Sequence, residues 1–130
     1  MNGVIEKEEV KIENMIYEIR GKQVMLDSDL AKLYQCKNGT KTINLAVERN
    51  IKRFPEDFCF QLTEDECLNL RFQIETSSLE KYNKHGGNRY LPYVFTEQGV
   101  SMLSATLKTD IAIEESIKII SVFIEKKKYT

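Results

Sequence analysis

The sequence of 130 residues contains one histidine, three cysteines and no long hydrophobic run. The histidine, His85, lies in a glycine-rich stretch without a cysteine, serine or acid at a recognisable catalytic spacing, which argues against general-base or nucleophilic catalysis. An odd cysteine count without a C-x-x-C motif indicates neither a disulfide framework nor a Cys/His metal site. We therefore expect no enzyme activity, no cofactor and no metal.

Membrane insertion and secretion are also not indicated. The longest apolar run, from Ile119 to Ile124, is interrupted by Ser121 and is far too short to span a bilayer. The N-terminus is polar and acidic and lacks the apolar segment of a signal peptide. The sequence thus predicts a cytoplasmic protein, with residues 1–13 as a disordered or frayed leader and residues 14–130 as a single domain.

Local patterns predict a mixture of short strands and helices. A β-hairpin is expected around Gly21, and a helix capped by Asp27 or Ser28 should follow it. Thr40 or Thr42 is expected to cap the next helix. Strands at residues 58–62 and 90–96 alternate with helices that start after a Thr63 capping box, at Thr96 and at Asp110. The fold class is therefore α+β: a small single domain with an N-terminal hairpin, a helix-turn-helix-like pair, short strands and C-terminal helices.

Charge is segregated along the middle of the chain. Residues 37–53 contain five basic side chains and one acid, a local sum of +4, whereas residues 56–66 contain five acids and no base. The attraction between phosphates and cations is local and is screened over about 10 Å. A chain with a net charge of only −1 can therefore still bind a polyanion through such a segment.

The segment "LDSDLAKLYQCKNGTKTINLAVERN" predicts a helix, a short turn and a second helix. In a helix-turn-helix the second helix enters the DNA major groove, where Asn44 can pair with adenine and Arg49 with guanine. The alternative is an ordinary amphipathic pair with a solvated polar face. The candidate DNA-binding residues are Lys37, Thr40, Lys41, Thr42, Asn44, Arg49 and Lys52, together with Lys84 and Arg89 further along the chain.

Two other segments have more than one interpretation. Residues 75–89 form a predicted loop whose basic end, with Gly86 and Gly87, is either a wing that follows phosphates or a solvated loop. Isoleucines at positions 113, 117, 120 and 124 form a helical stripe. The stripe either closes the core, which we expect, or forms the seam of a homodimer.

Two long motifs resemble the ORF6N-type domain, the N-terminal domain of phage and prophage antirepressor-like proteins, related in kind to KilA-N and Bro-N domains. They are "INLAVERNIKRFPEDFCFQLTEDE" and "GGNRYLPYVFTEQGVSMLSATL", and the resemblance runs from about Ile16 to Phe123. It implies a DNA-binding module of mobile elements, usually joined to a separate C-terminal domain. No such domain follows here, so we expect either a fragment or a short protein that only binds.

Within these motifs, the resemblance separates two groups of residues. Aromatic, leucine and glycine positions are expected to serve the fold mainly: Phe54, Phe58, Leu91, Tyr93, Phe95 and Gly99. Arg49, Lys52 and Arg89 are the better candidates for binding. The predicted function is a double-stranded DNA-binding domain of a phage-derived transcriptional regulator or antirepressor-like protein. The alternative is a protein-interaction module that binds a repressor, and a homodimer through the C-terminal helix is a further expectation.

Overall fold

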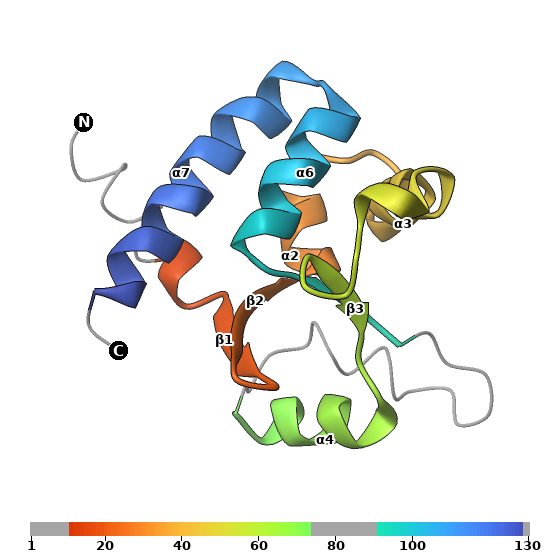
Figure 1. Ribbon diagram of the computed structural model, residues 1–130. Helices are drawn as coiled ribbons and strands as arrows, with labels where there is room; N and C mark the ends of the chain where they lie inside the picture. Colours follow the sequence, from red (N-terminus) through yellow and green to blue (C-terminus); the bar gives the residue numbers. More distant parts are fainter. Residues whose placement is uncertain (1–10, 74–90, 129–130) are drawn as a thin grey trace.

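The computed structural model describes residues 11–73 and 91–128, and its strands form one antiparallel sheet in the order β1-β2-β4-β3 (Figure 1). The first two strands, β1 (Ile16–Ile19) and β2 (Lys22–Leu26), are adjacent in the chain. The other two, β3 (Cys59–Gln61) and β4 (Tyr93–Phe95), come from distant segments, and β4 pairs with both β2 and β3. The α+β fold class is confirmed.

The predicted hairpin is confirmed, and its turn has a clear backbone cause. Arg20 and Gly21 both have positive φ, at 57° and 73°. Two successive residues of this kind are typical of the type I′ turn, whose twist matches the twist of paired strands. The turn sets the register in which Ile16 faces Met25 and Ile19 faces Lys22.

Helices lie on both faces of the sheet (Figure 1). One face is covered by four helices, namely α2 (Asp27–Leu33), α3 (Thr40–Arg49), α6 (Glu97–Leu107) and α7 (Asp110–Lys127). The opposite face is covered by α4 (Glu64–Gln73). A short 3-10 helix, η1 (Ile51–Arg53), continues the chain after α3. The described chain is therefore a sheet between two helical layers of unequal size.

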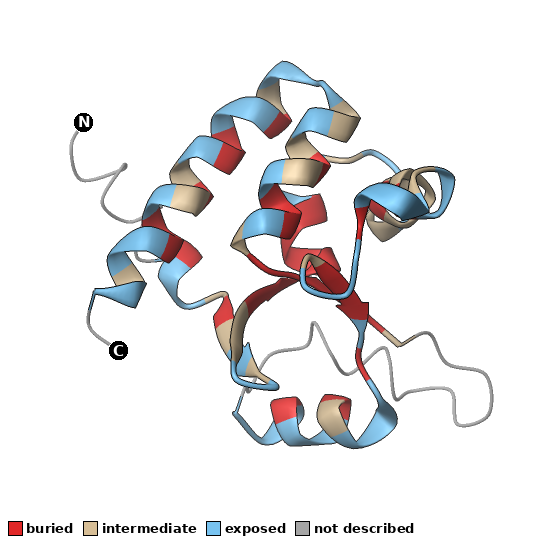
Figure 2. Ribbon diagram, in the orientation of Figure 1, coloured by how far each residue is buried: buried red, intermediate tan, exposed pale blue. Residues whose placement is uncertain are grey.

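The alternation of side chains along β2 and β4 divides the apolar core into two parts. Met25 and Phe95 point toward α2, α3, α6 and α7, whereas Val24, Leu26 and Val94 point toward α4. All five side chains are almost completely buried (Figure 2). The two central strands thus connect both layers of the molecule.

Helix starts differ from the predictions at several points. The N-cap of α7 is Thr109, whose Oγ1 accepts a hydrogen bond from the Ala112 amide, so Asp110 is the first helical residue and not the cap. Neither Thr40 nor Thr42 caps α3, because Gly39 is its N-cap. Likewise, the N-cap of α2 is Leu26, so Asp27 and Ser28 are its first helical residues and not its caps. The capping box of α4, by contrast, is confirmed, because Thr63 Oγ1 accepts from the Glu66 amide at 3.1 Å.

Two further expectations about burial are corrected. Of the predicted leader, residues 1–10 lie outside the described residues, whereas Ile12 is completely buried within the larger core cluster. On α7, the isoleucine stripe does not close the core: Ile113, Ile117 and Ile124 are exposed. The face of α7 that packs inward is displaced by one residue and contains Ala112, Ser116, Ile119 and Phe123.

Candidate nucleic-acid interface

α3 is held on the body of the molecule by one apolar side. Ile43 and Val47 are buried and one turn apart, and the helix packs against both α2 and α6. α2 is a short helix whose first five residues are all buried. The pair therefore has the predicted helix-turn-helix-like arrangement, with α2 inside and α3 at the periphery (Figure 1).

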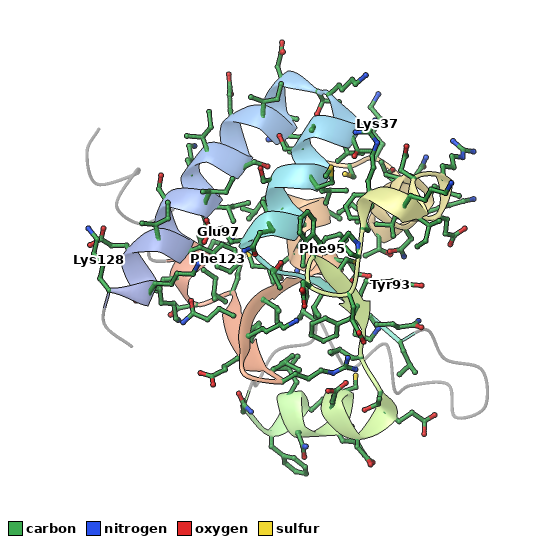
Figure 3. All side chains as sticks on the ribbon, viewed as in Figure 1. Lys37, Tyr93, Phe95, Glu97, Phe123 and Lys128 are labelled. Atoms are coloured by element: carbon green, nitrogen blue, oxygen red, sulfur yellow. The ribbon has the colours of Figure 1, made fainter. Side chains whose placement is uncertain are left out.

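The basic residues of this segment are exposed and have no partners. Among the residues that the structure describes, these cations form no ion pair and no side-chain hydrogen bond: Lys37, Lys41, Arg49, Lys52 and Arg53. We call these five residues the basic surface. Figure 3 shows Lys37 at the outer edge of the molecule, before α3 begins. The charged groups of the basic surface are thus available to an external anion.

The start of α3 adds a second favourable feature for anions. Helices α2, α4, α6 and α7 each carry at least one acid in the first turn, but α3 carries none there. The free backbone N–H groups and the dipole at a helix N-terminus attract negative charge. In α3 this end carries Thr40 and Lys41 in place of an acid, so no side chain compensates the helix dipole there. The amides of Lys41 and Thr42 themselves donate at 3.3 Å to the carbonyls of Asn38 and Gly39, so the attraction comes from the dipole and from Lys41.

The structure separates the two predicted base-reading residues. Asn44 and Arg49 are five positions apart, which places them about 140° apart around the helix axis. Oδ1 of Asn44 is buried, whereas Arg49 is exposed. Asn44 and Arg49 therefore do not face one ligand from the same direction. Thr40 and Thr42 are half-buried, and Lys84 and Arg89 lie outside the described residues.

One outward residue was missed by the sequence reasoning. Leu45 is half-buried and lies between Lys41 and Arg49 in the row with spacing i, i+4, i+8. That spacing was visible in the sequence, but an apolar residue was not considered for a polar face. Arg53 in η1 is a further exposed cation that makes no ion pair among the described residues.

The motif residues beyond position 53 meet at the junction of β3, β4 and α6. Phe54 and Phe95 stack edge to face with ring centroids 6.2 Å apart. Thr96 Oγ1 donates to the carbonyl of Asp57 at 2.8 Å and accepts from the Gly99 amide at 3.3 Å. At Gly99, an added Cβ would lie 1.9 Å from the carbonyl oxygen of Phe58. These contacts support the fold.

α2 contains two buried acids, and one of them is hydrogen-bonded to the sheet. Oδ2 of Asp27, which is completely buried, accepts a hydrogen bond from the Tyr93 amide at 3.1 Å. Asp29 is also buried, and loss of hydration together with the nearby Asp27 carboxylate raises its pKa to about 6, although Lys32 and Lys11 oppose the shift. Both acids lie in the interior of the fold and not on the basic surface.

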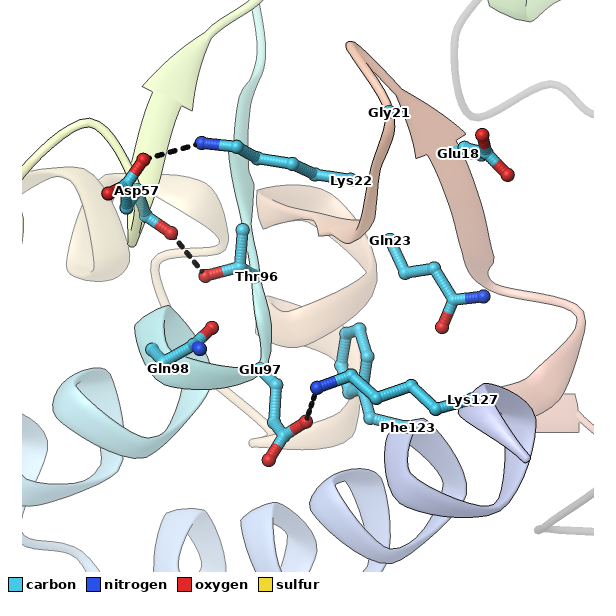
Figure 4. A pocket seen from close by; sticks show the side chains of 10 residues that line it. All are labelled: Glu18, Gly21, Lys22, Gln23, Asp57, Thr96, Glu97, Gln98, Phe123 and Lys127. Carbon is cyan, nitrogen blue, oxygen red and sulfur yellow. Dashed lines mark hydrogen bonds and ion pairs between the residues drawn. The ribbon is translucent and has the colours of Figure 1, made fainter. Parts of the chain in front are cut away.

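A cavity of about 510 Å³ lies between the hairpin and the ends of α6 and α7 (Figure 4). Four of the charged side chains that line it are paired with each other: Lys22 with Asp57 at 2.7 Å, and Lys127 with Glu97 at 2.8 Å. Among the described residues, no three metal-ligating side chains come together. In residues 11–73 and 91–128, every helix is too short or too polar to span a bilayer.

Comparison with known proteins gives one match. The family model of the ORF6N domain matches residues 14–106, which is most of the chain and includes the hairpin, α2, α3, the sheet and nearly all of α6. Searches of curated proteins and of solved structures gave no match. On the strength of that family match, the chain belongs to the ORF6N domain family.

Proposed function

We propose that this ORF6N domain binds double-stranded DNA, as part of a phage-derived transcriptional regulator or antirepressor-like protein in the cytoplasm. The observation that carries the proposal is the basic surface, whose five cations have no partner among the described residues. Cations that make no ion pair are free to displace counterions from phosphates, which is the main source of sequence-independent DNA affinity. No enzymatic role is part of the proposal.

The individual residues have distinct roles in this proposal. The start of α3, with Thr40, Thr42 and Lys41, receives a phosphate, because the Lys41 cation lies there and no acid compensates the positive end of the helix dipole. Lys37, Lys52 and Arg53 contact the DNA backbone. Arg49 is the best candidate for a base contact, and Leu45 beside it suits the methyl group of thymine. Asn44 is a weaker candidate because its Oδ1 is buried.

The second basic cluster remains part of the proposal. Lys84 and Arg89 belong to a glycine-rich segment outside the described residues, so their support comes only from the sequence. A loop of this composition lets the backbone approach a phosphate closely. Removing these two charges tests their contribution independently of α3.

The test is fluorescence anisotropy with a random-sequence duplex at low and at physiological salt. The Arg49→Ala/Lys52→Ala variant should bind at least about tenfold more weakly, and the slope of log affinity against log salt should fall by about 1, because Lys52 is assigned to a phosphate and Arg49 to a base. The control is Lys22→Ala/Arg71→Ala, which removes the same two residue types from the hairpin and α4. This control should bind almost like the parent.

Two outcomes contradict the proposal. A parent that does not bind at low salt shows that the basic surface is simply solvated or binds a protein. Equal losses in the two double variants show that only net charge matters, so that no particular surface faces the DNA.

The alternative function, a module that binds a repressor protein, has little support from the acidic residues 56–66. Its acids are partly used inside the molecule: Asp57 pairs with Lys22, and Glu66 pairs with Arg20 at 2.7 Å. The remaining support is the exposed apolar face of α7. A protein contact of this kind keeps its affinity as salt rises, which distinguishes it from DNA binding.

A further inference from the structure

Helix α7 has two apolar faces, and only one of them is used within the molecule. The inner face packs Ala112, Ile119 and Phe123 completely into the core. The outer face is the exposed isoleucine stripe, defined as Ile113, Ile117, Ile120 and Ile124, of which Ile120 is half-buried and packs partly against the core. Ile117 is 63% exposed and Ile124 is 47% exposed, which is unusual for such side chains when they serve only their own fold.

The stripe has the spacing of a helix-to-helix seam. Its members follow one another at intervals of 4, 3 and 4 residues, the alternation that places apolar side chains at positions a and d of a heptad. Beside it, α6 and α7 form a groove of about 400 Å³ lined by Ile120, Met102, Ala105 and Phe58, among others. Small side chains such as Ala105 leave room for a side chain from a second helix.

We infer that the exposed isoleucine stripe is the interface to a second copy of this chain, with the two α7 helices antiparallel across a twofold axis. In this arrangement Ile113 of one copy lies opposite Ile124 of the other, and Ile117 lies opposite Ile120. The stripe is therefore self-complementary, as a twofold interface requires. α7 has 18 residues and is about 27 Å long, and the stripe from Ile113 to Ile124 spans about 17 Å of it.

The charges of α7 favour the antiparallel orientation over the parallel one. The helix begins with Asp110 and has Glu114 in its second turn, both exposed, and it ends in Lys126, Lys127 and Lys128. Within one copy, Lys127 pairs with Glu97 at 2.8 Å, and Lys128 pairs with Glu125 at 3.5 Å in a largely exposed contact. Antiparallel packing in this register places Asp110 of one copy opposite Lys127 and beside Lys128 of the other, where it competes with Glu125 for Lys128, and it also opposes the two helix dipoles. Parallel packing would bring like charges together at both ends.

The two α6–α7 hairpins would then form a four-helix arrangement. The stripe lies apart from the basic surface, because α6 packs against α3 on one side and α7 on the other (Figure 1). The inference therefore does not rest on DNA binding, and each surface can be changed without changing the other.

The test is the molar mass in solution, measured by sedimentation or light scattering over about 10–200 µM protein. The parent should approach the mass of a dimer, whereas Ile117→Glu should stay monomeric with a dissociation constant raised at least about 100-fold. The matched control is Ile51→Glu, since Ile51 is an isoleucine that is 61% exposed on η1, away from α7. Circular dichroism of each variant shows that the monomer remains folded.

Charge reversal tests the orientation. Asp110→Lys alone should weaken the dimer by repelling Lys128, and combining it with Lys128→Glu should restore affinity to within a few-fold of the parent. A parent that stays monomeric across the whole range overturns the inference, as does an equal loss in Ile117→Glu and Ile51→Glu. If adding Lys128→Glu to Asp110→Lys weakens the dimer further, the antiparallel arrangement is overturned.

Discussion

Cations in two regions of this molecule have opposite surroundings. In the hairpin, Arg20 donates through Nε to Glu66 Oε2 at 2.7 Å and through a second nitrogen to Oε1 at 2.9 Å, and its guanidinium lies 4.2 Å from the ring centre of Phe60. On the basic surface, from Lys37 to Arg53, no cation has a partner among the described residues. The first region uses its charge to hold elements together, and the second does not.

The difference shows that the number of charges alone does not identify a binding surface. Arg20 and Lys22 are partly exposed and basic, but both have carboxylates within hydrogen-bonding distance, and these partners belong to the fold. A phosphate would have to displace those carboxylates to reach them. At Arg49 or Lys52 a phosphate would displace only water and counterions, so binding there is less costly.

The largest expected effect lies among the motif residues that only serve the fold. Gly99→Ala places a Cβ 1.9 Å from a backbone oxygen of Phe58, so β3 and α6 must move apart, and we expect a loss of at least about 3 kcal/mol in unfolding free energy. Gly21→Ala is the control, since its added Cβ meets nothing within 4 Å and only its positive φ is strained. Urea denaturation of both variants measures the difference, and equal losses would contradict the clash.

The second largest effect on stability is expected at Asp29, a buried acid whose charge is not fully compensated inside the fold. The pKa of Asp29 is raised to about 6 by burial, so folding disfavours its ionised form. Its contribution to stability is therefore complete below about pH 4 and declines as the pH rises toward 6. Asp29→Asn should be more stable than the parent by about 1–3 kcal/mol at pH 8 and nearly equal to it at pH 4. Thermal unfolding at the two pH values tests this, and a variant that is less stable at pH 8 would refute it.

Removing Arg20, the cation that pairs with Glu66, should lower the unfolding free energy by a smaller amount. Arg20→Ala removes a bidentate pair that is partly exposed, so we expect a loss of about 1–2 kcal/mol at pH 7. Glu66 has its pKa lowered to about 2, mainly by the hydrogen bond from Arg20. Its stabilising contribution is present above about pH 4.5 and disappears as the pH falls toward 2. The difference between parent and variant should therefore shrink over that window, and a constant difference would show that packing on Phe60 dominates.

Features of the fold that depend on neighbouring residues could be predicted from the sequence. The turn at Arg20 and Gly21 and the capping box at Thr63 and Glu66 are local, and both are present. The inner face of α7 could not be predicted. Ala112, Ser116, Ile119 and Phe123 have the same 4-3-4 spacing as the four isoleucines of the stripe, so periodicity cannot choose between the faces. We expected the more hydrophobic set, the four isoleucines, to face the core, whereas the structure buries the other set.

The candidate site was predictable only as a local excess of charge. That excess between residues 37 and 53 is visible in the sequence, but the pairing of Arg20 with Glu66 spans 46 positions and that of Lys22 with Asp57 spans 35. Such contacts depend on the pairing of β3 with β4 and on the position of α4, which no local pattern specifies. The sequence therefore cannot show which cations are neutralised within the fold.

The smallest expected effect is the most direct test of the comparison between the basic surface and the paired cations of the hairpin. If the basic surface has no role in the fold, Arg49→Ala/Lys52→Ala should change the unfolding free energy by no more than about 0.5 kcal/mol. At about 20 mM salt the double variant should be slightly more stable than the parent, because removing two of five cations relieves mutual repulsion. At about 500 mM salt, screening should abolish this difference in unfolding free energy. Arg20→Ala should respond in the opposite direction, since salt weakens the pair that it lacks. Urea denaturation of the parent, the double variant and Arg20→Ala at both salt concentrations measures these differences in unfolding free energy. A loss above about 1 kcal/mol in the double variant would mean that these cations stabilise the fold, and their exposure would then no longer indicate a ligand.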